Sequence, residues 1–210
     1  MPVLNDEVPD PDDFDADRPR GDFNMTPDDF IRSGSGSNPP GWLDKATIDD
    51  MRSKTPIPYV IVVPVHTDDL GRIRQVGTLL CANDESDVAL RRTLISGRVL
   101  YHESIREAIA RNISKDLGDL TLASLPPTVQ PFTVAQFFPT PGFSDYYDPR
   151  QHAIALCYIV PIAGEVEPQE ETLDVEWTDA SRALDPEFLS QLSYGMDHIL
   201  VQALAGSGML

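Results

Sequence analysis

The sequence contains little cysteine and no long apolar segment. Only Cys81 and Cys157 occur among the 210 residues, and because they form no CxxC pair, the common zinc motifs are excluded. Both lie in apolar, strand-like runs, which is typical of reduced thiols in a protein core. The longest apolar stretch, residues 153–163, is far shorter than the roughly 20 residues that a membrane helix needs. We therefore expect no membrane partner.

A secretory signal is also missing. The N-terminal residues are acidic and rich in proline, whereas a signal peptide begins with basic residues that an apolar segment follows. Together with the scarcity of cysteine, this feature favours a cytoplasmic location.

Basic residues are scarce as well. Lys and Arg number 16 against 34 Asp and Glu, which gives a formal net charge of -18. Such a charge repels nucleic acid and anionic membrane surfaces, so nucleic acid is not an expected partner. A small ligand that carries phosphate would need a local basic site within this acidic protein.

The N-terminal part of the chain differs from the rest. Its segments PDPDDFDAD and SGSGSNPPG show almost no periodic apolar pattern, and a chain of this composition cannot bury enough apolar surface to offset the entropy of ordering. We therefore predict a flexible acidic tail over residues 1–41 and one folded domain over residues 42–210. The tail is either a solvated segment or a docking segment that uses Phe14, Phe23 and Phe30.

Within the predicted domain, strand patterns and helix patterns follow one another. Runs of β-branched and apolar residues predict strands, and apolar residues three or four positions apart predict helices. In the first helix, Leu43, Ile48 and Met51 are predicted to face the core. The order predicts a mixed α/β (α+β) fold in which helices cover the faces of a sheet. The predicted elements are a helix at 43–53, strands at 59–67, 73–81 and 90–96, a helix at 104–117, strands at 132–138, 152–162 and 173–178, and a helix at 192–205.

The helix over residues 104–117 has the clearest end signals. Ser104 and Glu107 have the S-x-x-E spacing of a capping box, and Gly118 occupies the position of a C-terminal glycine cap. Glu107 and Arg111 are four residues apart, in the order that favours an ion pair. These signals predict both ends of the helix.

Residues 97–119, GRVLYHESIREAIARNISKDLGD, resemble the Nudix box, whose pattern is G-x(5)-E-x(7)-R-E-U-x-E-E-x-G-U with U an aliphatic residue. The hairpin and the late strand LDVEWT resemble other parts of this family, so the resemblance covers residues 58–205. The segments SGRVLYHE and DPRQHA look like an actinobacterial group within the superfamily. The box positions that match, without a gap in the spacing, are Gly97, Glu103, Arg111, Ile113 and Gly118.

The resemblance implies a Nudix-like α/β/α sandwich with a mixed sheet. It also implies that water cleaves the diphosphate bond of a nucleoside diphosphate linked to another moiety, with Mg²⁺ or Mn²⁺ as the cofactor. In that reaction Glu103 would orient the water or ligate the metal, Asp116 would ligate the metal, and Arg111 would hold the loop in place. The expected partner is a small nucleotide-type ligand.

The box departs from the family at its metal-binding positions. The three glutamates of the family's helix fall here on Asn112, Lys115 and Asp116, which lie within one arc of the helix. Magnesium is held by carboxylate and phosphate oxygens, and the ammonium of Lys115 would repel a cation from that arc. A metal site would therefore need a carboxylate from the loop before the last strand, at Glu165, Glu167, Glu170 or Glu171.

Three functions stay open. The first is a metal-dependent diphosphate hydrolase, and the second is a ligand-binding or regulatory module without catalysis or a metal cofactor. In the second, Lys115 would replace the charge of the metal, and Arg98, Arg111 and Arg150 could hold phosphate by forked contacts. The third is a protein-interaction scaffold. Arg111 can also serve only to tie the loop to the helix by pairing with Glu107 and Glu103.

A long aromatic loop over residues 139–151 is the expected specificity element, since ordered loops on a scaffold tend to carry function. A base or sugar would stack on Tyr146 or Tyr147, with Arg150 facing phosphate and His152 as a further ligand-binding candidate. The alternative is that the aromatic side chains only cap the edge of the core. A homodimer through the apolar edge of the hairpin is also open.

Overall fold

A mixed sheet of eight strands forms the centre of the fold in the computed structural model, which describes residues 43–82, 90–169 and 172–206. The predicted tail over residues 1–41 lies outside the described residues. The strands are β1 (Ile57–Thr67), β2 (Ile73–Ala82), β3 (Leu90–Thr93), β4 (Ile95–Arg98), β5 (Thr121–Ala123), β6 (Thr133–Phe137), β7 (Ala153–Gly164) and β8 (Thr172–Asp179).

Strand β1 has neighbours of both orientations. It runs parallel to β7 and antiparallel to β2 and β4. The main path through the sheet is β3-β2-β1-β7-β5, while β6 pairs with β7 and β8 pairs with β2. The parallel pair is possible because a long connection, which contains a helix, separates β1 from β7.

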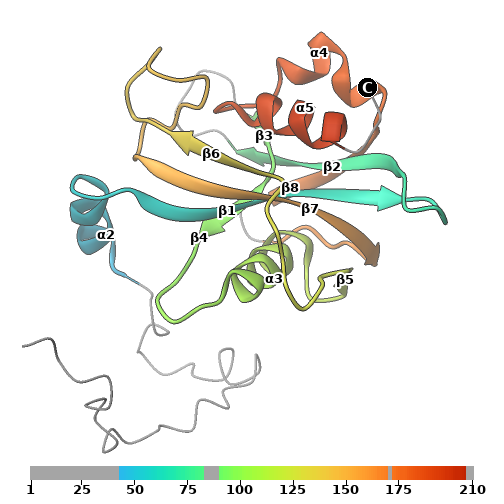
Figure 1. Cartoon of the computed structure of the whole chain (residues 1–210), viewed down its shortest axis with the longest axis horizontal. Coiled ribbons are helices and arrows are strands. Elements are labelled where there is room, and N and C mark those ends of the chain that lie inside the picture. Colours follow the sequence, from blue (N-terminus) through green and yellow to red (C-terminus); the bar gives the residue numbers. More distant parts are fainter. Residues whose placement is uncertain (1–42, 83–89, 170–171, 207–210) are drawn as a thin grey trace, which may run out of the picture. The chain divides into compact units, whose positions relative to one another are not determined.

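Helices lie on both faces of this sheet. Figure 1 shows α3 on one side of the sheet and α4 and α5 on the other. The mixed α/β fold expected from the sequence is therefore confirmed. No helix among the described residues is long and apolar enough to cross a membrane. The helices are α2 (Lys45–Arg52), α3 (Ile105–Leu117), α4 (Pro186–Leu189) and α5 (Met196–Gly206), with a short 3₁₀ helix at Arg182–Leu184.

Burial of β1 on both faces explains its apolar sequence. Ile61 and Val63 pack in a cluster with side chains of α5, whereas Val60 and Val62 pack in a second cluster with side chains of α3. Successive side chains of a strand point to opposite faces of the sheet. A strand that is covered on both faces therefore reads as a continuous apolar run without alternation.

The predicted strand over residues 90–96 is wrong in its extent. It is two strands, β3 and β4, which pair with β2 and β1 respectively. Leu94, which is 1% exposed, lies between them and anchors the point where the chain changes partner. This break has no signature in the hydrophobic pattern, because β3 and β4 each contain only one large apolar residue, Leu90 and Ile95.

Two other boundaries also differ from the prediction. The short strand β5 lies in a segment for which no element was predicted. The last helix begins at Met196, four residues later than expected. Tyr194 and Gly195 have φ values of 60° and 78°, and a right-handed helix cannot run through two residues with positive φ.

The ends of α3 follow the prediction. Ser104 and Glu107 form a reciprocal capping box, and Gly118, with a φ of 88°, caps the C-terminal end. The predicted ion pair between Glu107 and Arg111 is wrong. The carboxylate of Glu107 accepts hydrogen bonds from Ser104, while Arg111 pairs with Glu103. The capping box uses the carboxylate that the i, i+4 spacing had assigned to the arginine.

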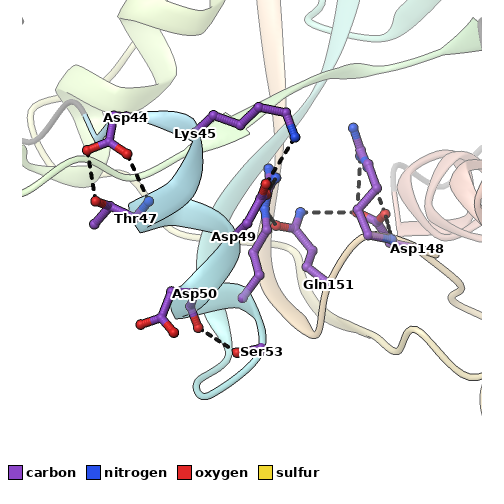
Figure 2. A network of polar contacts seen from close by, with 10 residues as sticks. Asp44, Lys45, Thr47, Asp49, Asp50, Ser53, Asp148 and Gln151 are labelled. Carbon is purple, nitrogen blue, oxygen red and sulfur yellow. Dashed lines mark hydrogen bonds and ion pairs between the residues drawn. The ribbon is translucent and has the colours of Figure 1, made fainter.

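Helix α2 is attached to the rest of the domain by polar contacts as well as by apolar packing. Ile48 is buried as predicted, whereas Met51 is 38% exposed and does not face the core. The Nε atom of Arg52, at the end of α2, donates to Oε1 of the buried Gln151 over 2.9 Å, and Gln151 donates to Asp148 over 3.1 Å. Figure 2 shows Gln151 between α2 and Asp148.

Replacing Ser104 with Ala should reduce the free energy of unfolding by about 1 kcal/mol, because the N-cap of α3 loses its side-chain acceptor. Chemical denaturation of the two proteins measures this difference. Ser53→Ala is the matched control, since the Ser53 hydroxyl only donates to the Asp50 carbonyl at an exposed helix end. It should change stability by less than roughly 0.5 kcal/mol, and an equal loss in both variants would contradict the assignment.

Candidate functional site

The box begins with an ion pair that joins α3 to the end of β4. Nε of Arg111 lies 2.6 Å from Oε1 of Glu103, and Nη2 lies 2.9 Å from Oε2. The same Nη2 donates to the carbonyl oxygen of Arg98 over 2.8 Å, and Oε2 also accepts from the amide of Leu100. The two side chains are 29% and 11% exposed. Both oxygens of Glu103 are therefore engaged in holding the loop between β4 and α3.

Asn112, at the first of the family's metal positions, is part of the packing. Its side chain is 1% exposed, and its amide donates to the carbonyl of Ala108 over 2.7 Å. The amide also lies directly over Gly97. A Cβ atom at residue 97 would come within 2.6 Å of the Asn112 Cγ and closer still to Oδ1. Gly97 is thus required by close approach of the helix to β4.

The other two metal positions pair with each other. The ammonium of Lys115 lies 3.8 Å from Oδ1 of Asp116. Across the described residues, His, Cys, Asp and Glu side chains form no group of three that could hold a metal ion. Since magnesium requires several oxygen ligands in near-octahedral geometry, this set of donors does not fit the carboxylate cluster that the resemblance implied.

The loop before β8 approaches the C-terminal end of α3 through its backbone. The amide of Glu167 donates to the Leu117 carbonyl over 2.9 Å, and the amide of Gln169 donates to the Asp116 carbonyl over 3.4 Å. The backbone of this loop therefore lies beside the box helix, where a metal site would need an additional carboxylate. Of the four candidate carboxylates, Glu170 and Glu171 lie outside the described residues.

A cavity opens on the face of the sheet opposite to α3. Its apolar wall belongs to the cluster packed against α5, and its polar wall contains a serine, a carboxylate and a guanidinium. The cavity is lined by Tyr59, Ile61, Ser96, Phe137, Asp148, Arg150, Ala153, Ala155, Tyr194 and Met196. Strands β1, β4, β6 and β7, the aromatic loop and the start of α5 therefore meet at one site.

Arg150 is held in place within this lining. Its Nε and Nη2 atoms lie 2.9 and 3.1 Å from the two oxygens of Asp148. The forked hydrogen bonds that Arg150 donates to this buried carboxylate raise the pKa of Arg150 above its usual value, against the effect of burial. Because Asp148 also accepts from Gln151, the guanidinium is fixed in direction by a second layer of polar contacts.

The other predicted residues of the aromatic loop lie outside the lining. The ring of Tyr146 packs 5.4 Å from that of Phe137, and its hydroxyl accepts from Gln202 over 2.9 Å. Desolvation by this packing raises the pKa of Tyr146. Tyr147 forms a backbone bridge with Phe138. These contacts match the alternative expectation that the loop caps the edge of the core.

His152 lies at the start of β7, beside the aromatic loop. Its ring stacks on Phe138 at 4.6 Å, and its Nε2 atom lies 2.8 Å from the amide nitrogen of Gln136. His152 therefore has local partners and does not line the cavity.

Two tyrosines of the cavity were missed in the sequence. Tyr59 lies in β1, and Tyr194 precedes α5. The guanidinium carbons of Arg91 and Arg150 lie 5.7 and 5.9 Å from the centre of the Tyr194 ring, within the range of cation–π attraction. A tyrosine with positive φ costs backbone energy and often marks a functional segment. The dipeptide Tyr194–Gly195 before an amphipathic run was the available signal.

Comparison with known proteins gives one family and several structural relatives. Residues 38–209 match the family model described as "Domain of unknown function (DUF4916)". A protein from Jonesia denitrificans, described as a possible asymmetric diadenosine tetraphosphate (Ap(4)A) hydrolase, is 46% identical. The match covers 75% of this chain and 98% of that chain, with a TM-score of 0.71. No curated protein matches.

More distant solved structures share the fold. A NUDIX hydrolase from Nitrosomonas europaea is 10% identical, with 73% and 91% of the two chains covered and a TM-score of 0.53. The NUDIX domain of Shewanella oneidensis NrtR, crystallised with ADP ribose, is 16% identical, with 87% and 99% covered and a TM-score of 0.52. At such identities the likeness concerns the fold alone, and it agrees with the resemblance that the box suggested.

Replacing Gly97 with Ala should destabilise the protein by about 1–3 kcal/mol, because the new methyl group overpacks the Asn112 amide. Denaturant unfolding measures the loss. Gly206→Ala is the control, since nothing lies within 4 Å of the Cβ that it would add. Combining Gly97→Ala with Asn112→Ala should cost less than the sum of the single changes. Additive losses would show that another contact limits residue 97.

Proposed function

The chain belongs to the DUF4916 family and has the fold of the Nudix hydrolases, and on this basis we propose that it binds a nucleotide-type ligand in the cavity on the α5 side of the sheet. The binding does not need the family's metal cluster. The observation that carries the proposal is the composition of the cavity, where two tyrosines and a fixed arginine converge.

The lining offers the contacts that a nucleotide requires. The faces of Tyr59 and Tyr194 can stack on a base or ribose, and stacking on an aromatic side chain contributes about 1–3 kcal/mol per base. Arg150 is oriented by Asp148, so little side-chain entropy is lost when it meets phosphate. Concave sites with aromatic walls and a few fixed polar groups are typical of small-ligand binding.

The donors of the box support binding without metal-dependent catalysis. Nudix hydrolases generally use divalent metals, but Asn112 is buried in packing and Lys115 faces Asp116. A carboxamide and an ammonium cannot replace two carboxylates as magnesium ligands. The retained pair of Glu103 and Arg111 serves in this proposal to hold the loop in position.

Metal-dependent hydrolysis of a diphosphate bond is the second candidate function. The hydrogen bonds from Glu167 and Gln169 to the end of α3 favour it, because they bring an acidic loop beside Asp116. Mg²⁺ or Mn²⁺ at Asp116 and one loop carboxylate would polarise phosphate and activate water. The description of the Jonesia denitrificans relative as a possible Ap(4)A hydrolase makes Ap(4)A a suitable substrate to test.

Calorimetric titration of the full chain with ADP-ribose and with ATP in EDTA should show binding that Ser96→Leu abolishes. Ser96 lines the cavity from β4, and a leucine there would fill the space that the ligand needs. Ser181→Leu, at an exposed position before the 3₁₀ helix, is the matched control and should bind as the unaltered chain does. Release of phosphate from ATP and Ap(4)A is followed in parallel, with and without magnesium.

The outcomes separate the functions. Binding in EDTA without turnover supports the binding module. Binding and turnover that both require magnesium would contradict it and support the hydrolase. If no nucleotide bound in either buffer, the remaining expectation from the sequence, an interaction scaffold, would replace both.

Lys115→Glu should raise the affinity for Mn²⁺, measured by calorimetry, because it removes a repelling charge and adds a carboxylate beside Asp116. We expect a gain of about tenfold, equivalent to roughly 1.4 kcal/mol. Lys45→Glu makes the same change of charge at an exposed position on α2 and should leave the affinity unchanged. An equal response in both variants would mean that net charge alone attracts the metal.

A further inference from the structure

Arg98 lies at the margin of the cavity. It is the last residue of β4, and it lies directly opposite Tyr59 of β1 in the antiparallel register. Ser96, two residues earlier on the same strand, lines the cavity together with Tyr59. Residues two apart on a strand, and residues directly opposite on neighbouring strands, share one face of the sheet. The side chain of Arg98 therefore lies on the cavity face, beside Tyr59.

The neighbouring arginines are each bound to acceptors within the domain. Arg52 donates to Gln151 and pairs with Asp49 over 3.1 Å. Arg111 forms its fork with Glu103, and Arg150 forms its fork with Asp148. These hydrogen bonds hold α2, the box loop and the aromatic loop in place, so each of the three guanidinium groups already has an acceptor within the domain.

Arg98 differs from these arginines. Among the described residues, no carboxylate, carbonyl or other acceptor binds its guanidinium, although the side chain is half-buried. Burial lowers the pKa of Arg98, Tyr59 partly opposes this shift, and the positive charges of Arg52 and Arg111 lower the pKa further. In a chain with a net charge of -18, a half-buried cation beside two others marks a place that an anion would stabilise.

We propose that Arg98 is the centre of a phosphate-binding site at the margin of the cavity, and that it receives the diphosphate group of the ligand directly, without a divalent cation. The ligand class is an organic diphosphate whose aromatic part lies against Tyr59 and Tyr194. This inference deepens the proposed function and rests on it for the position of the aromatic part.

The chemistry of the guanidinium supports this assignment. Its planar array of donors matches two phosphate oxygens at once, and such forked bonds to an ionised group are among the stronger hydrogen bonds in proteins. Arg52 and Arg111 add positive potential without giving up their own partners. Lys115 is less suited to this role, because its ammonium already lies 3.8 Å from Asp116. In this proposal, Arg98 supplies the positive charge that a divalent metal supplies in Nudix hydrolases.

Calorimetric titration of the full chain with pyrophosphate in EDTA tests the site. The unaltered chain should bind pyrophosphate, and added NaCl should weaken the binding. Arg98→Gln should weaken it by about 10-fold to 100-fold, the loss expected for hydrogen bonds to a charged group. Arg98→Lys keeps the charge but loses the fork, so it should show an intermediate loss. Arg182→Gln, at an exposed position on the 3₁₀ helix, removes the same charge and should bind normally.

The same titrations with ADP-ribose separate this inference from the proposed function. If Arg98→Gln binds both ligands as tightly as the unaltered chain, the phosphate site is overturned while the nucleotide cavity stands. If pyrophosphate binding depends on Arg98 but ADP-ribose binds no more tightly than pyrophosphate, the phosphate site stands and the nucleotide cavity is overturned. Absence of pyrophosphate binding to the unaltered chain would overturn the phosphate site outright. Thermal unfolding of each variant verifies that it is folded.

Discussion

Burial of β1 on both faces is the constraint on which the rest of the domain depends. The strand is parallel to β7, antiparallel to β2 and β4, and covered by α3 on one side and α5 on the other. A strand in this position divides the apolar core into two clusters. The box helix packs in one cluster and the other cluster lines the cavity, so β1 and its partner β4 lie between the two sites.

The box retains its structural contacts more completely than its metal-binding chemistry. Gly97 permits the close approach of Asn112, and Arg111 joins Glu103 to the carbonyl of Arg98. Both contacts hold α3 against the sheet, and neither requires a cation. The family's metal positions, by contrast, present an amide, an ammonium and one carboxylate. A helix can keep its place in the fold while these positions change in charge, because the contacts between Asn112 and Gly97 and between Arg111 and Glu103 hold it without a cation.

A group of arginines gives the acidic domain local basic character near the cavity. Arg52, Arg111 and Arg150 each fix a segment by binding an acceptor in it. The positive charges of Arg52 and Arg111 act together at Arg98, although the chain as a whole is strongly negative. Electrostatic attraction between exposed charges falls off over about 8–10 Å in physiological salt, so a small anion at this site responds mainly to the local arginines and much less to the acidic surface elsewhere.

The sequence by itself determined those features of the fold that depend on residues close together in the chain. The capping box of α3, its C-terminal glycine, most of the strands and the spacing of the box all arise from contacts within a few positions of the chain. Tertiary structure decided which partner each group meets. Arg111 pairs with Glu103 because Glu107 is taken by the cap, the chain changes partner at Leu94, and Tyr59 meets Tyr194 at the cavity. The last two arrangements join residues that are far apart in the chain, and no local pattern of hydrophobicity or charge encodes them.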